Sequence, residues 1–282
     1  MGQGDLASPF YIIDRVMKKE LVVIGCSFSH DYVVKEIDGY REVTSFSNNG
    51  YITYNDLEPF KIWPTIVAER LNLKLVNLSM SGSGNERIFS KVLDYVSKNH
   101  KKISKVIVQW SGILRLDLET LYGLRLLGWQ HLNPSNIPEH GHPEGFDQVV
   151  KDLAKKSWPN VTSGINGWLR RVYALQNVFT QLNVDYHFVT GLTEEKEISP
   201  GVFDENWYTK CADALLKSQY FDLIDKEKYI GWPVWEDLDG FCFQDIIHSH
   251  EENNWKYWCS QTDGHPNKLG HEKIAETILN EI

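Results

Sequence analysis

The sequence predicts an α/β fold in which helices cover both faces of a mostly parallel sheet. Short runs of apolar, β-branched residues alternate along the chain with segments of helical periodicity. These runs are apolar throughout, which is typical of strands that are buried on both faces. The first run stops at Gly25, where a strand is expected to enter a tight turn. We therefore expect a three-layer α/β/α arrangement.

The first half of the chain supplies three of the expected strands and two of the expected helices. Residues 21–25 form an apolar run that predicts the first strand, and residues 74–79 return as the second. Between them, residues 64–73 predict a helix, because this segment begins with a proline, which suits a first helical turn. Apolar residues recur with helical spacing over 85–99. Residues 105–110 then predict the third strand.

The second half repeats this alternation. Residues 165–183 are strongly amphipathic and predict a helix, and residues 184–192 predict a fourth strand directly behind it. The last helix is expected over 266–282, with a proline at its start. Its apolar face is expected to consist of Leu269, Ile274 and Ile278.

Between these elements the periodicity weakens, and we expect one domain over 1–282 with insertions at about 33–60, 116–165 and 193–260. Asn49-Gly50, which lies between two β-prone runs, predicts a type I′ hairpin in the first insertion. Eight of the ten tryptophans lie from Trp129 onward. They would either stack on sugar rings or pack the insertions themselves. They are Trp129, Trp158, Trp168, Trp207, Trp232, Trp235, Trp255 and Trp258.

Composition excludes several classes of protein. A formal net charge of -9 disfavours a nucleic-acid-binding surface, which needs concentrated lysine and arginine. No apolar run approaches the ~18 to 20 residues of a membrane span, and the first 20 residues do not resemble a secretory signal. Scattered cysteines without a C-x-x-C pair fit a reduced, cytoplasmic setting. These are Cys26, Cys211, Cys242 and Cys259.

Two groups of histidines contain side chains of the kind that bind metal ions. Their spacing, however, matches no familiar metal site. We therefore expect neither a metal nor a cofactor. One group is His131, His140 and His142. The other is His248 and His250, with Glu251 and Glu252 beside them.

The residues best suited to catalysis lie next to the first strand and the last helix. Ser27 follows the first strand, and His265 precedes the last helix. In an open parallel sheet these two places meet above the carboxyl edge, where ligand sites form. A hydroxyl, an imidazole that takes its proton, a group that orients the imidazole and N–H donors together perform acyl transfer.

Three segments resemble the SGNH hydrolase superfamily, the GDSL esterases and lipases. The segment LVVIGCSFSHDY resembles its first block, NLSMSGSGN its second and TDGHPNKLGH its last, in the family's order. The resemblance implies that Ser27 is the nucleophile and first oxyanion donor, Gly82 the second donor and His265 the base. It also implies a flavodoxin-like sheet without a cofactor. It covers roughly residues 20–115, 166–192 and 261–282.

The sequence departs from the family at the first and third blocks. Cys26 replaces the family's aspartate, and we interpret it as a buried thiol rather than an alternative nucleophile. The asparagine expected after the third strand, which is the third oxyanion donor, is missing. Asn85 is our candidate replacement, with Ser111 and Arg115 as others. Asn85 would alternatively cap the helix that begins there.

The last block is one residue short, because Asp263 stands two residues before His265, with Thr262 at the family's aspartate position. In an extended chain an i, i+2 pair points the same way, so Asp263 would still reach the imidazole. Otherwise Asp263 and Gly264 form only a turn, and Ser27 and His265 work as a dyad.

These residues together predict a serine esterase that hydrolyses an O-acyl ester, with a small molecule or an acetylated carbohydrate as substrate. The catalytic residues would be Ser27, His265 and Asp263, and the oxyanion donors Ser27, Gly82 and Asn85. No nucleic-acid or membrane partner is expected, and the oligomeric state stays open. One alternative is a non-catalytic module of the same fold that binds glycan or protein, and another is an O-acyltransferase. Large insertions on a short scaffold resemble divergent members from bacteria and phages, for which a virion-associated location also fits.

Overall fold

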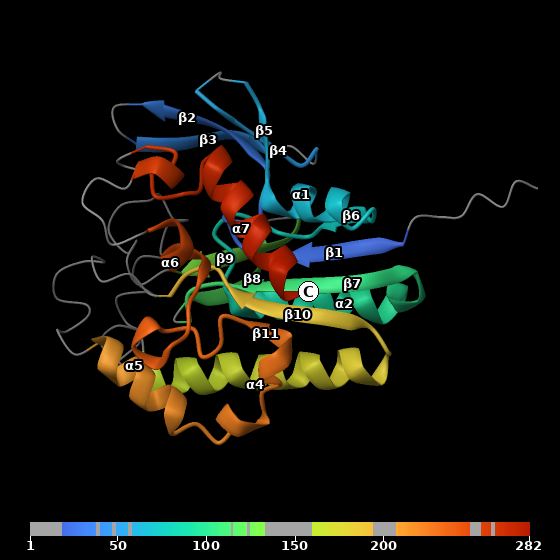
Figure 1. Cartoon of the computed structure of the whole chain (residues 1–282), viewed down its shortest axis with the longest axis vertical. Coiled ribbons are helices and arrows are strands. Elements are labelled where there is room, and N and C mark those ends of the chain that lie inside the picture. Colours follow the sequence, from blue (N-terminus) through green and yellow to red (C-terminus); the bar gives the residue numbers. More distant parts are fainter. Residues whose placement is uncertain are drawn as a thin grey trace, which may run out of the picture.

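The computed structural model describes most of the chain, including Ser27, Gly82, Asp263 and His265 (Figure 1). The described residues are 19–37, 40–46, 49–55, 58–113, 115–122, 125–132, 160–193, 207–248, 255–260 and 263–282.

The central sheet has five strands, and every neighbouring pair is parallel. Their spatial order is β6-β1-β7-β10-β11, which is the doubly wound order 2-1-3-4-5. This confirms the predicted sheet and its four strands. β11 has only two residues and was not predicted. The bounds are β1 Glu20–Ile24, β6 Lys74–Asn77, β7 Ile103–Trp110, β10 Asp185–Thr190 and β11 Tyr229–Ile230.

Four helices cover the two faces of this sheet, so the three-layer α/β/α fold is confirmed (Figure 1). α1 (Trp63–Arg70) and α7 (Lys268–Glu281) pack on one face. α2 (Asn85–Asn99) and α4 (Val161–Gln181) pack on the other. All four were predicted, with ends that differ by a few residues.

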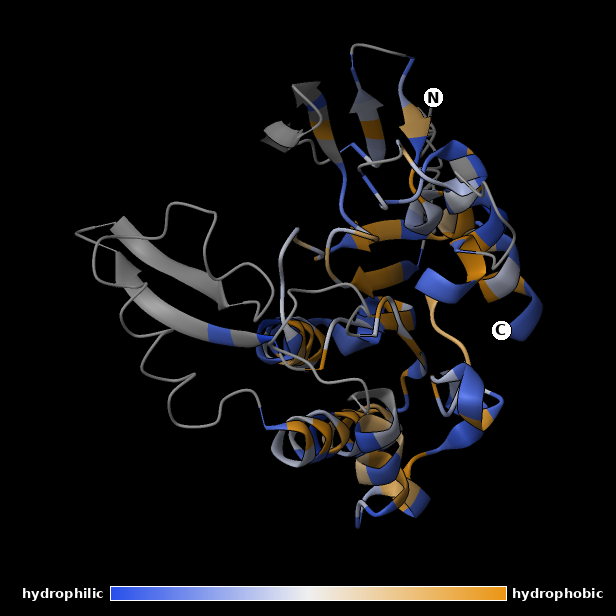
Figure 2. Cartoon of the chain, turned by 90° about the vertical axis from the view of Figure 1, so that its left-hand side faces the viewer, coloured by the Kyte–Doolittle hydropathy of each residue, from blue (hydrophilic) through white to orange (hydrophobic). Residues whose placement is uncertain are grey.

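Alternation along β1 divides the core into two clusters. Leu21 and Val23 contact the layer of α1 and α7, whereas Val22 and Ile24 contact the layer of α2 and α4. All four side chains are fully buried. Figure 2 shows the same division, with apolar residues on the strands and on the inner faces of the helices.

The insertions contain elements that the sequence did not predict. β8 (Leu116–Tyr122) and β9 (Arg125–Leu132) pair as an antiparallel hairpin. The last insertion holds α5 (Trp207–Leu216) and α6 (Phe243–Ile247). It also holds the 3-10 turns η3 Phe221–Leu223, η4 Lys226–Lys228, η5 Glu236–Leu238 and η6 Trp255–Tyr257, and η1 (His100–Lys102) follows α2. The division into one domain with three insertions stays a prediction.

The predicted hairpin at Asn49-Gly50 is wrong. The first insertion forms a sheet of order β3-β2-β4-β5, so β2 separates the two strands that this turn was expected to join. Gly50 instead serves long-range contacts: its N–H donates to Asp31 Oδ2 at 2.8 Å, and its carbonyl accepts from Ile62 N–H at 3.2 Å. The strands are β2 Tyr32–Ile37, β3 Tyr40–Phe46, β4 Tyr51–Tyr54 and β5 Phe60–Lys61.

Two expectations about individual side chains are also settled. Leu269 is 45% exposed, so it does not belong to the buried face of α7, which Ile274 and Ile278 do form. Leu269 lies five residues before Ile274, which places it well off that face. Trp168 and Trp235 are 1% and 5% exposed and meet edge to face in the core, as packing residues do.

Several side chains named in the sequence analysis lie outside the described part of the structure. They are those of Trp129, Trp158, Trp207, Trp255, His131, His140, His142, His250, Glu251, Glu252 and Thr262. Among the described residues, no helix has both the length and the apolar composition that a membrane span requires.

Candidate active site

Ser27 lies in a tight turn at the carboxyl edge of the sheet. β1 ends at Ile24, and the N–H of Ser29 donates to the carbonyl of Cys26 at 3.1 Å. Ser27 and Phe28 are therefore the two central residues of the turn. The place is the switch point of the sheet, where connections leave β1 in one direction and β7 in the other. Only 6% of Ser27 is exposed.

The segment before α7 brings His265 to Ser27. His265 Nε2 lies 2.8 Å from Ser27 Oγ, although the residues are 238 positions apart in the sequence. The other ring nitrogen, Nδ1, lies 2.5 Å from Asp263 Oδ1. A neutral imidazole with its proton on Nδ1 donates to this carboxylate, which leaves Nε2 free to accept the serine proton.

The short Asp-x-His spacing is accommodated by a local turn. Asp263 Oδ1 accepts the backbone N–H of His265 at 3.1 Å, so the carboxylate folds back over its own chain. The same oxygen meets the imidazole, and Asp263 is only 4% exposed. The sequence left two alternatives for Asp263, a turn before the helix or a contact with the imidazole. In the structure Asp263 does both.

Neighbouring backbone holds this segment in place. Cys259 N–H donates to the carbonyl of His265 at 2.9 Å. Asn267 caps α7, since its Oδ1 accepts from Gly270 N–H at 3.0 Å. Its Nδ2 donates to the carbonyls of Lys256 and Trp258 at 2.9 and 2.8 Å. The histidine is thus fixed by the helix cap that follows it.

His248 packs behind the same segment and is a neighbour that sequence reasoning did not find. Its Nε2 is 3.7 Å from the place where a Cβ on Gly264 would lie, and its ring centroid is 4.0 Å from that of Trp258. Burial lowers the pKa of His248 to about 4. His248 is therefore neutral at pH 7 and adds no positive charge beside His265.

The loop over residues 77–84 is hydrogen-bonded to the serine turn and to the residues on either side of it. Met80 N–H donates to Gly25 O at 3.1 Å, and Asn77 Nδ2 donates to Ser29 O at 2.8 Å. In addition, Ser81 N–H donates to His30 Nδ1 at 3.1 Å. The loop that carries Gly82 is thereby held beside the turn that carries Ser27.

Gly82 has a φ of 78°, in the left-handed region where a side chain is strained. The sequence therefore needs glycine at this point for conformational reasons alone. The N–H groups of Ser27 and Gly82 remain our predicted oxyanion donors.

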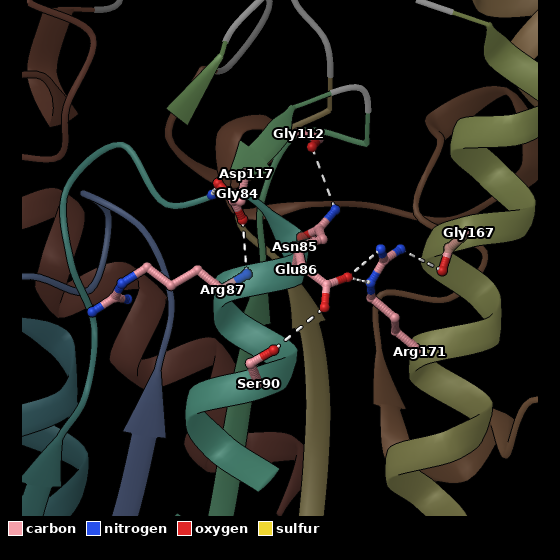
Figure 3. A network of polar contacts seen from close by, with 9 residues as sticks. All are labelled: Gly84, Asn85, Glu86, Arg87, Ser90, Gly112, Asp117, Gly167 and Arg171. Atoms are coloured by element: carbon pink, nitrogen blue, oxygen red, sulfur yellow. Dashed lines mark hydrogen bonds and ion pairs between the residues drawn. The ribbon is translucent and has the colours of Figure 1, made fainter. Parts of the chain in front are cut away.

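Asn85 joins the start of α2 to the end of β7. Its Oδ1 accepts from Ser111 N–H at 2.8 Å, and its Nδ2 faces the carbonyls of Ser111 and Gly112 at 3.2 and 3.4 Å. Figure 3 shows the contact with Gly112. The capping alternative is wrong, because Gly84 is the N-cap and no side chain caps the helix from that position. The oxyanion role of Asn85 stays a prediction.

The other two candidates for the missing donor follow the same strand, with Ser111 buried and Arg115 partly exposed. Ser111 is fully buried, and Ser111 Oγ and Arg115 Nε have no hydrogen-bond partner among the described residues. Their participation in the oxyanion site also stays a prediction.

Asp117 caps α2 from the second insertion, a contact that no sequence motif predicts. Its carboxylate accepts from Gly84 N–H at 2.9 Å and from Arg87 N–H at 2.8 Å (Figure 3). These are two of the N–H groups that a helix start leaves without intrahelical partners. Asp117 is 5% exposed. An acid from β8 therefore fixes the helix that follows the Gly82 loop.

Cys26 is fully buried, and its Sγ accepts a hydrogen bond from Gln109 Nε2 at 3.1 Å. This supports the interpretation of Cys26 as a buried thiol. Among the described residues, the four cysteines form no disulfide with one another.

No protein-family model matches the sequence, and no curated protein matches it. Solved structures are similar in their chain path. A lipolytic protein of the G-D-S-L family from Desulfitobacterium hafniense has 11% identity and a TM-score of 0.44, with 94% of this chain and 99% of that chain covered. The esterase EstA from Pseudoalteromonas has 10% identity and a TM-score of 0.44, with 93% and 96% covered. An acetylxylan esterase from Geobacillus stearothermophilus has 12% identity and a TM-score of 0.42, with 94% of each chain covered. Because these scores are low, the residues of this chain have to carry the functional proposal.

Proposed function

We propose that this chain is a divergent SGNH-type serine esterase, with Ser27 as nucleophile, His265 as general base and Asp263 as the residue that orients the imidazole. One observation carries the proposal: Ser27 Oγ, His265 Nε2, His265 Nδ1 and Asp263 Oδ1 follow one another at 2.8 and 2.5 Å. A nucleophile within hydrogen-bond reach of a base that is itself oriented by an acid is the arrangement that activates serine.

The reaction would proceed in two halves. Ser27 Oγ attacks the ester carbonyl while His265 Nε2 takes the hydroxyl proton, and the oxyanion develops towards the N–H groups of Ser27 and Gly82. His265 then gives the proton to the departing alcohol as the C–O bond breaks. Water attacks the acyl-serine and passes a proton to His265. His265 returns this proton to Ser27 Oγ as the acyl C–O bond breaks, which releases the acid and restores Ser27.

The distance between serine and histidine favours catalysis over the binding-module alternative. A module that only binds needs no hydrogen bond between these two side chains, whereas general-base catalysis needs about 2.6 to 3.2 Å. The observed 2.8 Å lies within that range.

The test compares the wild type with Ser27→Ala in hydrolysis of 4-nitrophenyl acetate and in labelling by a fluorophosphonate. We expect the wild type to hydrolyse the ester and to be labelled once. Ser27→Ala should lose labelling and at least about 10³-fold in rate. The control is Ser104→Ala, at the opposite end of the sheet on β7, which should behave like the wild type. Equal rates for the wild type and Ser27→Ala, with no labelling of the wild type, would exclude the esterase.

The alcohol part of the substrate is a separate part of the proposal. Acetylated oligosaccharides, 4-nitrophenyl acetate and a long-chain 4-nitrophenyl ester distinguish a carbohydrate ester from a lipid. The buried Trp168 and Trp235 are not available for sugar stacking, so a carbohydrate preference would have to come from other aromatic residues of the insertions. Addition of an acceptor alcohol tests the acyltransferase alternative, because transfer would divert the acyl group from acetate to the new ester.

A further inference from the structure

Gln109 is a polar side chain in the middle of the apolar core. It lies in β7, between β1 and β10, and it is completely buried. It interrupts the otherwise apolar end of a strand whose other residues from Val106 onward pack the two core clusters. A buried amide without partners is costly, so the contacts of this side chain indicate why it is present.

Both ends of the amide contact the turn that carries Ser27. Ser29 Oγ donates to Gln109 Oε1, and Gln109 Nε2 donates to Cys26 Sγ at 3.1 Å and to Trp110 O at 3.3 Å. Cys26 and Ser29 are the first and fourth residues of the turn, because Ser29 N–H bonds to Cys26 O. A single side chain therefore holds the turn on either side of Ser27.

Two glycines make room for this side chain. A Cβ on Gly25 would lie 2.4 Å from Gln109 Oε1, and a Cβ on Gly191 would lie 1.9 Å from Gln109 Nε2. Both distances are far below van der Waals contact, so the ends of β1 and β10 lie close to the amide only because they lack side chains. Gly25, which first marked the end of the strand in the sequence, thus has a packing reason as well as a turn reason.

We propose that Gln109 is a positioning residue that sets the place of Ser27 Oγ relative to His265 Nε2. The inference rests on the proposed esterase function and deepens it. Without the amide, Cys26 and Ser29 lose their shared partner, and the central residues of the turn gain freedom to move. Displacement of a reacting group by about 1 Å can cost about 100-fold in rate, so the effect belongs in kcat rather than in substrate binding.

The main variant is Gln109→Met, which keeps the length of the side chain and removes its hydrogen bonds. We expect kcat for 4-nitrophenyl acetate and the rate of fluorophosphonate labelling to fall together by about 10- to 100-fold. KM should change by less than about threefold. The control is Val172→Ala, a fully buried position on α4, which supplies none of the hydrogen bonds to the turn described above. At a comparable loss of unfolding free energy, this control should keep its labelling rate.

A double-mutant cycle tests whether the effect passes through the turn. Ser29→Ala removes the donor to Gln109 Oε1, so it should reproduce part of the loss. Ser29→Ala combined with Gln109→Met should be no slower than Gln109→Met alone, because both changes break the same contact. Fully additive losses, or a Gln109→Met protein that is labelled as fast as the wild type, would overturn the proposal.

Crystal structures of the wild type and Gln109→Met separate this inference from the esterase proposal. We expect the Ser27 Oγ to His265 Nε2 distance to exceed about 3.5 Å in the variant. If the wild type is inert but the distance lengthens, the esterase proposal fails and the positioning role stands. If the wild type is active and the variant keeps both its rate and its hydrogen bond, the positioning role fails and the esterase stands.

Discussion

Removal of the Asp117 carboxylate should cost stability and serine reactivity together. The side chain accepts two backbone N–H groups at 2.9 and 2.8 Å, and it is 5% exposed. Asp117→Ala leaves both donors buried without a partner, and each such donor costs about 1–3 kcal/mol. It also removes a negative charge from the start of α2, which is worth about 0.3–1 kcal/mol. Since some water will reach the space that is left, we expect a loss of about 2–4 kcal/mol in the free energy of unfolding.

Asp117→Asn tests the same reasoning with a smaller change. An amide keeps one acceptor oxygen and its shape, so one of the two hydrogen bonds survives and the expected loss is about 1–2 kcal/mol. The free energy of unfolding should therefore decrease from the wild type to Asp117→Asn and from Asp117→Asn to Asp117→Ala, by the amounts given.

The assay is urea unfolding followed by far-UV circular dichroism, with fluorophosphonate labelling of the folded protein alongside. The matched control is Asp213→Ala, an aspartate on α5 that pairs with Lys217 where both side chains are largely exposed. We expect that control to change stability by no more than about 0.5 kcal/mol. If Asp117→Ala were as stable as this control, the two hydrogen bonds would not be holding α2, and the reasoning would be refuted.

Three further predictions concern backbone strain, core packing and pH. Gly82→Ala forces a side chain onto a φ of 78°, so we expect a loss of about 1–2 kcal/mol in urea unfolding and slower labelling of Ser27. Phe179→Ala removes a fully buried ring and should cost about 3–5 kcal/mol in the same assay, with an unchanged labelling rate in the folded fraction. Burial lowers the pKa of His271 to about 3, below about 6.5 in the unfolded chain, so the unfolded state takes up this proton first as the pH falls. Because of His271 alone, the free energy of unfolding should therefore fall by up to about 1.4 kcal/mol per pH unit as the pH is lowered from about 6.5 to 3. His271→Asn, which keeps an acceptor for Trp63 N–H, should flatten that decline, and an unchanged slope would contradict the assignment.

The sequence predicted those elements whose cause is local. Residues 21–24 are apolar without interruption because β1 is covered on both faces, and this pattern can be read without knowledge of the neighbours. The helices at Trp63–Arg70 and Asn85–Asn99 carry similarly local signals in a first-turn proline and a regular apolar spacing. The meeting of Ser27 and His265 was predictable because a parallel sheet brings all carboxyl ends to one edge.

Elements whose cause is tertiary could not be predicted in this way. β11 has two residues, too few for any periodicity, and exists through its pairing with β10. The dipeptide Asn49-Gly50 is typical of a hairpin turn. In the folded chain, however, the hydrogen bond from Gly50 to Asp31 and the pairing of β4 with β5 determine how this segment is placed. Local turn propensity was overridden by contacts that only the folded chain provides.

The same distinction explains the candidate active site. The groups proposed to react lie in recognisable motifs, whereas the groups that hold them are buried polar side chains from elsewhere: Gln109, Asp117 and Asn85. Each satisfies backbone or side-chain groups of a loop that it does not belong to. Asn85 shows the consequence most clearly, because its amide is already engaged with Ser111 and Gly112, just after the end of β7. While Asn85 stays in that contact, its Nδ2 faces protein carbonyls. In the proposed esterase, the oxyanion would then rely on the backbone N–H groups of Ser27 and Gly82. If the proposed site works with two donors in place of three, its rate should be about 10²–10³ lower. Slow turnover together with slow labelling of Ser27 is therefore the kinetic behaviour that such a site predicts, because both reactions use the same donors.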